Sequence, residues 1–363
     1  MIVHGGDVWQ VGDEMGIPAP QLLDFSANIN PRGLPPQARD RLARDAADPR
    51  LLSLYPDPSA HRLRNALSEQ LAVDADAIAV GPGAESLLGP ILRCLHPKQA
   101  LVPVPAFSEY RRVCEQQQIE FAAFPLHRSE LFRTPVDGLC RRIESESPGA
   151  VLLNNPHNPS GTMLNPHEIR RVADTAISFL ATLLLDEAFI DYVPHASLVR
   201  EAATQPGLIV VRSLTKFYGC PALRVGYAVA HPETIRRIVS LLPTWPVTQL
   251  AIDALAEAVA DREYAEASLL ENAVERQQLS ESLSGLGLVV FPSAANYLLL
   301  ELGEDMPTAS ELRTRLARNH RILIRNCDSY EGIAPGRYVR VAVRVREENC
   351  RLIQALAHEL RLP

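Results

Sequence analysis

Three apolar stretches of this chain each run into a polar residue, and this feature most limits how the chain can fold. Asn158 follows the stretch 151–153, Asp186 follows the apolar run 177–185, and Lys216 follows another short apolar stretch. One βα unit of chain separates each polar residue from the next. Ligands of open α/β sheets bind at the carboxyl ends of the strands. The pattern therefore predicts an α/β sheet with these three side chains at one edge.

The lysine of this set has an unusual setting. Lys216 is the only lysine after Lys98, and every other cation in that span is Arg or His. An amine forms Schiff bases with carbonyls, which a guanidinium does not. The hydroxyls of Ser213 and Thr215 flank it, and Arg224 follows eight residues later. A solvated loop lysine is the plainer interpretation. The set nevertheless suits a phosphate beside a covalently attached carbonyl, which predicts pyridoxal phosphate as cofactor and Lys216 as its nucleophile.

Composition limits the class of protein. The length of 363 residues, with 47% hydrophobic and 22% charged residues, is typical of a two-domain globular enzyme. A net charge of -7 opposes a nucleic-acid surface. The six cysteines lie far apart with no Cys-x-x-Cys pair, so we expect no metal ion and reduced thiols in the cytoplasm. The start of the chain lacks a signal-peptide pattern, and the run 176–185 is too short to span a bilayer.

The first 30 residues are predicted to form an arm that reaches across a binding cleft. His4 precedes two glycines, and Asn30 ends the turn-rich segment 24–31. Both side chains could contact a ligand. A turn or capping role for Asn30 is an equal alternative, and a lone histidine is more often structural.

A glycine turn at 81–85, Gly-Pro-Gly-Ala-Glu, lies between a predicted strand and a predicted helix. Backbone amides at a helix N-terminus bind anions, so this turn is a candidate phosphate site. A dinucleotide fingerprint needs glycine where Ser86 stands, and a P-loop needs Gly-Lys-Ser/Thr, so a nicotinamide dehydrogenase is disfavoured. Further on, Phe107 follows another predicted strand. It either stacks on a flat ring or belongs to the core.

Two further features concern charge. Asp186 directly follows a buried strand, where a carboxylate can pair with a protonated pyridine nitrogen and raise the pKa of that nitrogen. In the predicted strands 321–325 and 338–343, Arg325 and Arg340 alternate with apolar residues. Solvated faces produce such patterns too. In an acidic protein, however, guanidinium groups near a cleft suit an anionic substrate.

The motifs Asn-Pro-His-Asn158-Pro-Ser-Gly, Asp186-Glu-Ala-Phe and Ser-Leu-Thr-Lys216, with Arg224-Val-Gly after them, resemble those of the class I/II aminotransferases. These are fold-type-I pyridoxal-phosphate enzymes, and the resemblance spans nearly the whole chain. It implies an α/β fold with a mostly parallel seven-stranded sheet between helices and a smaller C-terminal α/β domain. The expected boundaries are an arm at 1–30, a large cofactor domain at 31–245 and a small domain at 246–363.

The resemblance also implies a role for each site residue. Lys216 forms the Schiff base, Asp186 pairs with the pyridine nitrogen, and Asn158 bonds the phenolic oxygen of the ring. A homodimer with shared active sites is implied. The remaining expected contacts are Phe107 stacked on the ring, Gly83, Ala84, Ser213 and Arg224 at the phosphate, Tyr55 at the phosphate of the neighbouring subunit, and Arg325, Arg340, His4 and Asn30 at the substrate.

The sequence departs from the family at two places. Phe189 stands where many members have a tyrosine that bonds the phenolic oxygen, and the turn 81–85 lacks the polar residues usual in the phosphate cup. Runs elsewhere are similar to the branch of the family that acts on phosphorylated amino acids. Decarboxylation and transamination both remain open. A regulator on this fold would need a DNA-binding domain, and we expect none before Asp24.

Overall fold

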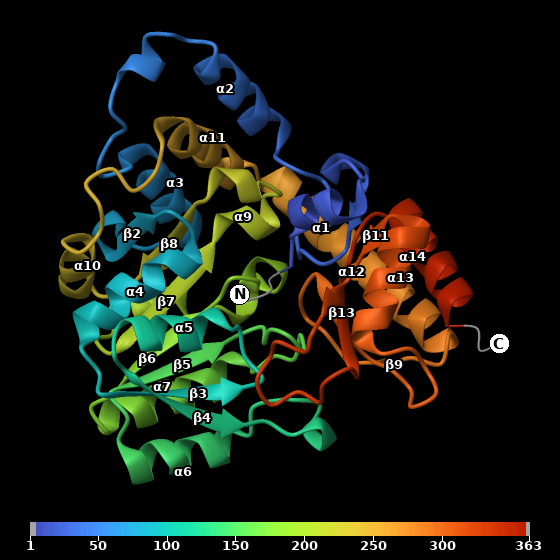
Figure 1. Cartoon of the computed structure of the whole chain (residues 1–363). Coiled ribbons are helices and arrows are strands. Elements are labelled where there is room, and N and C mark those ends of the chain that lie inside the picture. Colours follow the sequence, from blue (N-terminus) through green and yellow to red (C-terminus); the bar gives the residue numbers. More distant parts are fainter. Residues whose placement is uncertain (1–4, 361–363) are drawn as a thin grey trace.

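In the computed structural model, which describes residues 5–360, a seven-stranded sheet forms the larger part of the molecule (Figure 1). The strand order is β2-β8-β7-β6-β5-β3-β4. β8 is antiparallel to both neighbours and the other pairs are parallel, which confirms the predicted fold class. The strands are β2 (Ile78–Gly81), β3 (Gln99–Val104), β4 (Glu120–Pro125), β5 (Ala150–Asn154), β6 (Thr182–Asp186), β7 (Leu208–Ser213) and β8 (Gly226–Val229).

Helices cover both faces of this sheet, which explains why its central strands are apolar without interruption. Along β5, Val151 and Leu153 join one core cluster, whereas Leu152 joins the cluster on the opposite face. One layer contains α2 (Pro36–Ala46), α3 (His61–Leu71), α6 (Val136–Glu146), α7 (Pro166–Ser178), α8 (Val199–Ala202) and α11 (Gln249–Ala260), and the other contains α4 (Ala84–Leu95), α5 (Glu109–Gln116) and α10 (Pro232–Val239).

The C-terminal part is built on a second, antiparallel sheet with the order β12-β13-β10-β9. Its apolar side packs against three helices to form a separate core cluster. The strands are β9 (Val289–Val290), β10 (Tyr297–Glu301), β12 (Arg325–Asn326) and β13 (Tyr338–Ala342), and the helices are α12 (Arg262–Gly285), α13 (Ala309–His320) and α14 (Arg346–Glu359). The boundary expected at residue 245 stays a prediction.

The N-terminal segment is attached to the C-terminal part. It contains α1 (Val8–Met15) and β1 (Leu23–Asp24), and β1 pairs in parallel with β11 (Ile322–Leu323). Phe25 is fully buried in the C-terminal core cluster. Figure 1 shows α1 next to β11 although they lie at opposite ends of the chain. The segment is therefore fixed by strand pairing and by burial of a large side chain.

Two secondary-structure predictions were wrong in detail. The apolar run 177–185 is not one strand, because α7 ends at Ser178 and β6 begins at Thr182. Hydrophobicity alone does not separate the end of a buried helix from a buried strand. The predicted strand 321–325 is divided between β11, which pairs with β1, and β12, which pairs with β13. Within residues 5–360, no helix combines the length and the apolar character needed to cross a membrane.

Candidate active site

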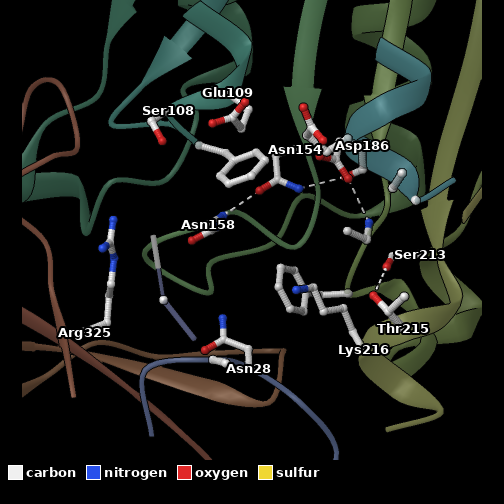
Figure 2. Close-up of a pocket in the computed structure, with 18 of the residues that line it drawn as sticks. Asn28, Ser108, Glu109, Asn154, Asn158, Asp186, Ser213, Thr215, Lys216 and Arg325 are labelled. Carbon is white, nitrogen blue, oxygen red and sulfur yellow. Dashed lines mark hydrogen bonds between the residues drawn. The ribbon is translucent and has the colours of Figure 1, made fainter. Parts of the chain in front are cut away.

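A cavity of about 550 Å³ lies at the carboxyl ends of β5, β6 and β7. Asn158, Asp186 and Lys216 all line it, so the three strand ends converge as the sequence pattern predicted. Figure 2 shows the three side chains around one space, with Asn28 of the N-terminal segment and Arg325 of the C-terminal sheet on its other side. Three regions of the chain therefore contribute to a single site.

Lys216 lies on α9 (Leu214–Phe217), a single helical turn directly after β7. Its pKa is lowered to about 8, and desolvation of the amine by burial is the largest cause. The positive charges of Arg340 and Arg224 contribute to this lowering, and the charge of Asp186 opposes it. About a tenth of the amine is therefore neutral and nucleophilic at pH 7, far more than for an ordinary lysine.

Asp186, at the end of β6, is held by donors on both carboxylate oxygens. Tyr110 donates its hydroxyl to Oδ2 at 2.5 Å, and the backbone N–H of Ala188 donates to Oδ1 at 2.9 Å. Burial raises the pKa of Asp186, and the bond from Tyr110 is the main effect that opposes this rise. Burial and then the charge of Asp186 raise the pKa of Tyr110 well above its ordinary value, so Tyr110 remains a donor.

Sequence reasoning missed Tyr110. The one signal was its position a single helical turn after Phe107, at the start of α5. Phe107 itself lines the cavity, and its ring meets that of Tyr110 edge to face, with centroids 5.8 Å apart. Two aromatic residues of one segment thus reach the site, one through its ring and one through its hydroxyl.

Asn158 belongs to a second hydrogen-bonded group, with two residues of the C-terminal part. Its Oδ1 accepts from Arg340 Nη1 at 2.5 Å and from the Tyr330 hydroxyl at 3.0 Å. Both donors use the carbonyl oxygen, so the amide nitrogen is the group of Asn158 that can donate to a ligand. Tyr330 also lines the cavity and was missed, because it lies in an irregular loop without a recognisable pattern.

Gly83 and Ala84 at the N-terminus of α4 form a narrow cradle with Arg224. Gly83 has φ +105°, and a Cβ there would lie 3.0 Å from Arg224 Nη2. A Cβ on Gly226 would lie 2.3 Å from the backbone nitrogen of Ala84. The close approach therefore requires glycine at both positions. Unpaired N–H groups of a helix N-terminus beside a guanidinium suit a phosphate.

Other groups complete the cradle. Ser213 lines the cavity, and its hydroxyl is 2.8 Å from that of Thr215. Glu85, whose charge would oppose an anion, forms an ion pair with Arg112 at 2.6 Å. The residues present therefore fit the phosphate of pyridoxal phosphate, while Lys216 fits its aldehyde and Asp186 its pyridine nitrogen.

The two predicted substrate arginines lie side by side. Arg325 on β12 and Arg340 on β13 are direct partners in the strand register, and both line the cavity while almost fully buried. Arg325 donates to Ser329 Oγ at 2.7 Å. Phe189 also lines the cavity, so an apolar ring occupies the position where the sequence departs from its relatives.

Asn30 contradicts the prediction of a substrate contact. It does not line the cavity, and its Nδ2 donates to the Phe217 carbonyl and to the hydroxyls of Tyr264 and Ser268. The structural role that the sequence left open is the one observed. Asn28, and not Asn30, lines the cavity. The buried Oδ1 of Asn28 accepts no hydrogen bond within the described residues.

Two other predicted residues do not reach the cavity in this chain. His4 lies outside the described residues. Tyr55 is 77% exposed and stacks on Trp245 with ring centroids 4.3 Å apart. It does not line the cavity of its own chain. Its expected contact with a neighbouring subunit stays a prediction.

A lysine of lowered pKa, a buried carboxylate and an anion cradle, set at the edge of a mostly parallel seven-stranded sheet, define a pyridoxal-phosphate enzyme of fold type I. The sequence matches the family model "Aminotransferase class I and II" over residues 20–356, and the chain belongs to that family.

Individual relatives show the same class. Threonine-phosphate decarboxylase of Salmonella typhimurium is 34% identical over 361 residues, which cover 98% of this chain and 96% of that protein. Histidinol-phosphate aminotransferase of Roseiflexus castenholzii is 30% identical over 351 residues, which cover 95% of this chain and 92% of that protein. The crystal structure of histidinol-phosphate aminotransferase from Sinorhizobium meliloti in complex with pyridoxal 5'-phosphate matches with a TM-score of 0.87 and 25% identity over 97% of this chain and 94% of that one. The protein is thus a pyridoxal-phosphate-dependent enzyme.

Proposed function

We propose that this enzyme decarboxylates L-threonine O-3-phosphate to (R)-1-amino-2-propanol O-2-phosphate, which supplies the side chain of cobalamin. The observation that carries the proposal is the pair Arg325 and Arg340, both nearly buried at the cavity of an acidic protein. The guanidinium fork matches the geometry of carboxylates and phosphates. The similarity to a threonine-phosphate decarboxylase over almost the whole chain supports the same reaction.

Four arginines of the described part of the chain line the cavity, and Arg112 among them forms ion pairs with Glu85 and Glu109. Arg224 belongs to the cradle beside Gly83, where it serves the cofactor phosphate. We assign Arg325 and Arg340, which are neighbours on the C-terminal sheet, to the two anionic groups of an amino acid that carries a carboxylate and a phosphate, one arginine to each. Asn28, whose carbonyl oxygen has no partner among residues 5–360, can accept from the substrate's ammonium group.

When bound, pyridoxal phosphate would supply an electron sink for the bond that breaks at Cα of the substrate. Asp186 keeps a proton at the pyridine nitrogen through the charge that Tyr110 stabilises. Arg340 would hold the carboxylate and Arg325 the phosphate, and the orientation that Arg340 imposes would select the bond between Cα and the carboxylate as the one that breaks. Lys216, whose pKa is about 8, can then return a proton to Cα.

Transamination by a histidinol-phosphate aminotransferase is the second candidate, because a protein of that name is 30% identical over 351 residues. A rotation that places the Cα–H bond perpendicular would let the same residues run this reaction. Serine phosphate is a narrower alternative substrate, since one methyl group changes discrimination by only about 1–3 kcal/mol.

The deciding experiment incubates the enzyme, loaded with pyridoxal phosphate, with L-threonine phosphate and traps carbon dioxide. We expect rapid release without a keto acid, and an Arg340→Met variant is expected to release it about 10–100-fold more slowly, because a charged hydrogen bond is lost at the reacting group. Absence of release, together with 2-oxoglutarate-dependent loss of histidinol phosphate, would replace the proposal with the aminotransferase.

We further propose a homodimer in the cytoplasm, in which Tyr55 contacts the cofactor phosphate of the partner subunit. Four large apolar side chains of this region are between 48% and 77% exposed, namely Leu52, Leu54, Tyr55 and Trp245. Such exposure is expected of a surface that a second copy of the chain covers. The six cysteines are free thiols, which suits a reducing compartment.

Replacement of Tyr55 by phenylalanine tests this contact. We expect the dissociation constant of pyridoxal phosphate to rise about 10-fold, because one hydrogen bond to a charged group is lost, while light scattering still reports a dimer. Trp9→Phe, at a second exposed aromatic residue on α1, is the control and should bind the cofactor normally. A monomer in solution, or unchanged cofactor binding in Tyr55→Phe, would contradict the proposed role.

A further inference from the structure

Two histidines and a glutamate meet at the ends of α13 and α14, outside the active-site cavity. His320 is the last residue of α13, and His358 and Glu359 are the last two of α14. Glu359 Oε1 lies 3.0 Å from His320 Nε2 and 3.3 Å from His358 Nδ1. One nitrogen from each ring and this oxygen all lie within 4.8 Å of one another. None of the three residues lines the cavity that holds Lys216.

These separations match those of ligands around a small transition-metal ion. A tetrahedral zinc ion bound at about 2.0–2.1 Å to nitrogen and oxygen has ligand atoms about 3.4 Å apart. The two N···O distances, 3.0 and 3.3 Å, lie close to this value, and the two ring nitrogens lie within 4.8 Å of each other. The imidazole rings are inclined at 70°, with centroids 5.4 Å apart, so they approach the carboxylate from different directions and do not stack.

The surroundings also resemble those of a metal site. Asn319 donates its Nδ2 to the same Oε1 at 2.8 Å, and this bond fixes the orientation of the carboxylate. The side chain of Glu359 is 7% exposed, that of His320 is 25% exposed, and that of His358 is 71% exposed. The group is therefore anchored on its inner side and open to water on the other, where solvent can complete the coordination.

We propose that His320, His358 and Glu359 bind one divalent transition-metal ion, with zinc as the representative, and that this ion links the ends of α13 and α14. Two imidazoles and one carboxylate are the donor set that zinc accepts, whereas magnesium and calcium prefer oxygen ligands. This site could not be predicted from the sequence, because His320 and Glu359 are 39 positions apart and no spacing motif joins them.

The test uses the full-length enzyme loaded with pyridoxal phosphate and freed of metal with a chelator. Zinc chloride is titrated into it by isothermal calorimetry, and thermal unfolding is followed with and without zinc. We expect one equivalent to bind at micromolar concentration and to raise the unfolding temperature, and magnesium to do neither. The double variant His320→Ala/His358→Ala should bind at least about 100-fold more weakly, and Asn319→Ala about 10-fold more weakly.

Matched variants separate this site from others on the surface. His167→Ala, at an exposed histidine of α7, and Cys350→Ser, at the one exposed cysteine, should bind zinc like the unmodified protein. The single variant His358→Ala removes a mostly exposed side chain, so it is expected to fold. It replaces the double variant in the binding test if the double variant does not fold. No saturable zinc binding by the unmodified protein, or equal binding by His358→Ala, would overturn the proposal.

Discussion

Replacement of Lys216 by alanine is expected to lower kcat by at least about 10³-fold, because the nucleophile and the nearest proton carrier are lost together. The chain contains two lysines, and the other, Lys98, is exposed on the surface. Borohydride reduction of the loaded enzyme followed by peptide mapping should therefore find the cofactor on Lys216 alone. Lys98→Ala is the matched control, with unchanged kcat and unchanged labelling.

The lowered pKa of Lys216 gives this prediction a pH dependence. With a pKa of about 8, the neutral amine dominates above that pH and falls about 10-fold for each unit below it. The rate at which added pyridoxal phosphate becomes attached to the cofactor-free enzyme should rise up to about pH 8 and then level off. A continued rise toward pH 10, or a reducible adduct on the Lys216→Ala protein, would contradict the assignment.

The second large effect is expected at Asp186. Asp186→Asn removes the buried negative charge opposite the pyridine nitrogen, and kcat should fall about 10²–10⁴-fold, as for loss of a positioned acid–base group. Tyr110→Phe keeps that charge but removes the 2.5 Å hydrogen bond to Oδ2. A hydrogen bond to a charged group is worth about 1.5–3 kcal/mol, so kcat should fall about 10–100-fold.

The pH profile separates a direct effect of Tyr110 from a packing effect. Its hydrogen bond lowers the pKa of Asp186, so its removal must raise that pKa and move the acid limb of the kcat profile to higher pH. Tyr218→Phe is the control, because Tyr218 is equally buried but bonds Gln70 away from the cavity. An acid limb at the same pH in Tyr110→Phe and the unmodified enzyme would assign Tyr110 a packing role only.

The sequence was enough to place in the candidate site those residues that follow strands of the large sheet. It was not enough to place residues that other segments bring to the site. Asn158, Asp186 and Lys216 lie at or shortly after the end of an apolar strand, and local pattern is enough to place such residues at one sheet edge. Tyr110 and Asp186 are 76 positions apart, and Tyr330 and Asn158 are 172 apart. Contacts of this kind depend on the packing of whole elements.

Neighbouring positions of one loop were equally hard to tell apart. Asn28 and Asn30 lie in the same turn-rich segment and carry the same side chain. Asn30 points into the protein toward Phe217, and Asn28 lines the cavity. In irregular chain no periodicity decides which side a residue faces, so only the structure separates them.

The pairing of β1 with β11 makes the two ends of the chain one mechanical part. Ser26, just after β1, accepts a hydrogen bond from Arg340 through its carbonyl oxygen, and the Phe25 carbonyl accepts from the backbone of Ala342. Ser26 and Asn28, which line the cavity, therefore belong to the same hydrogen-bonded unit as the C-terminal sheet that carries Arg325 and Arg340. A substitution that weakens the pairing of β1 with β11 is expected to disturb the substrate side of the cavity although it lies outside the cavity itself.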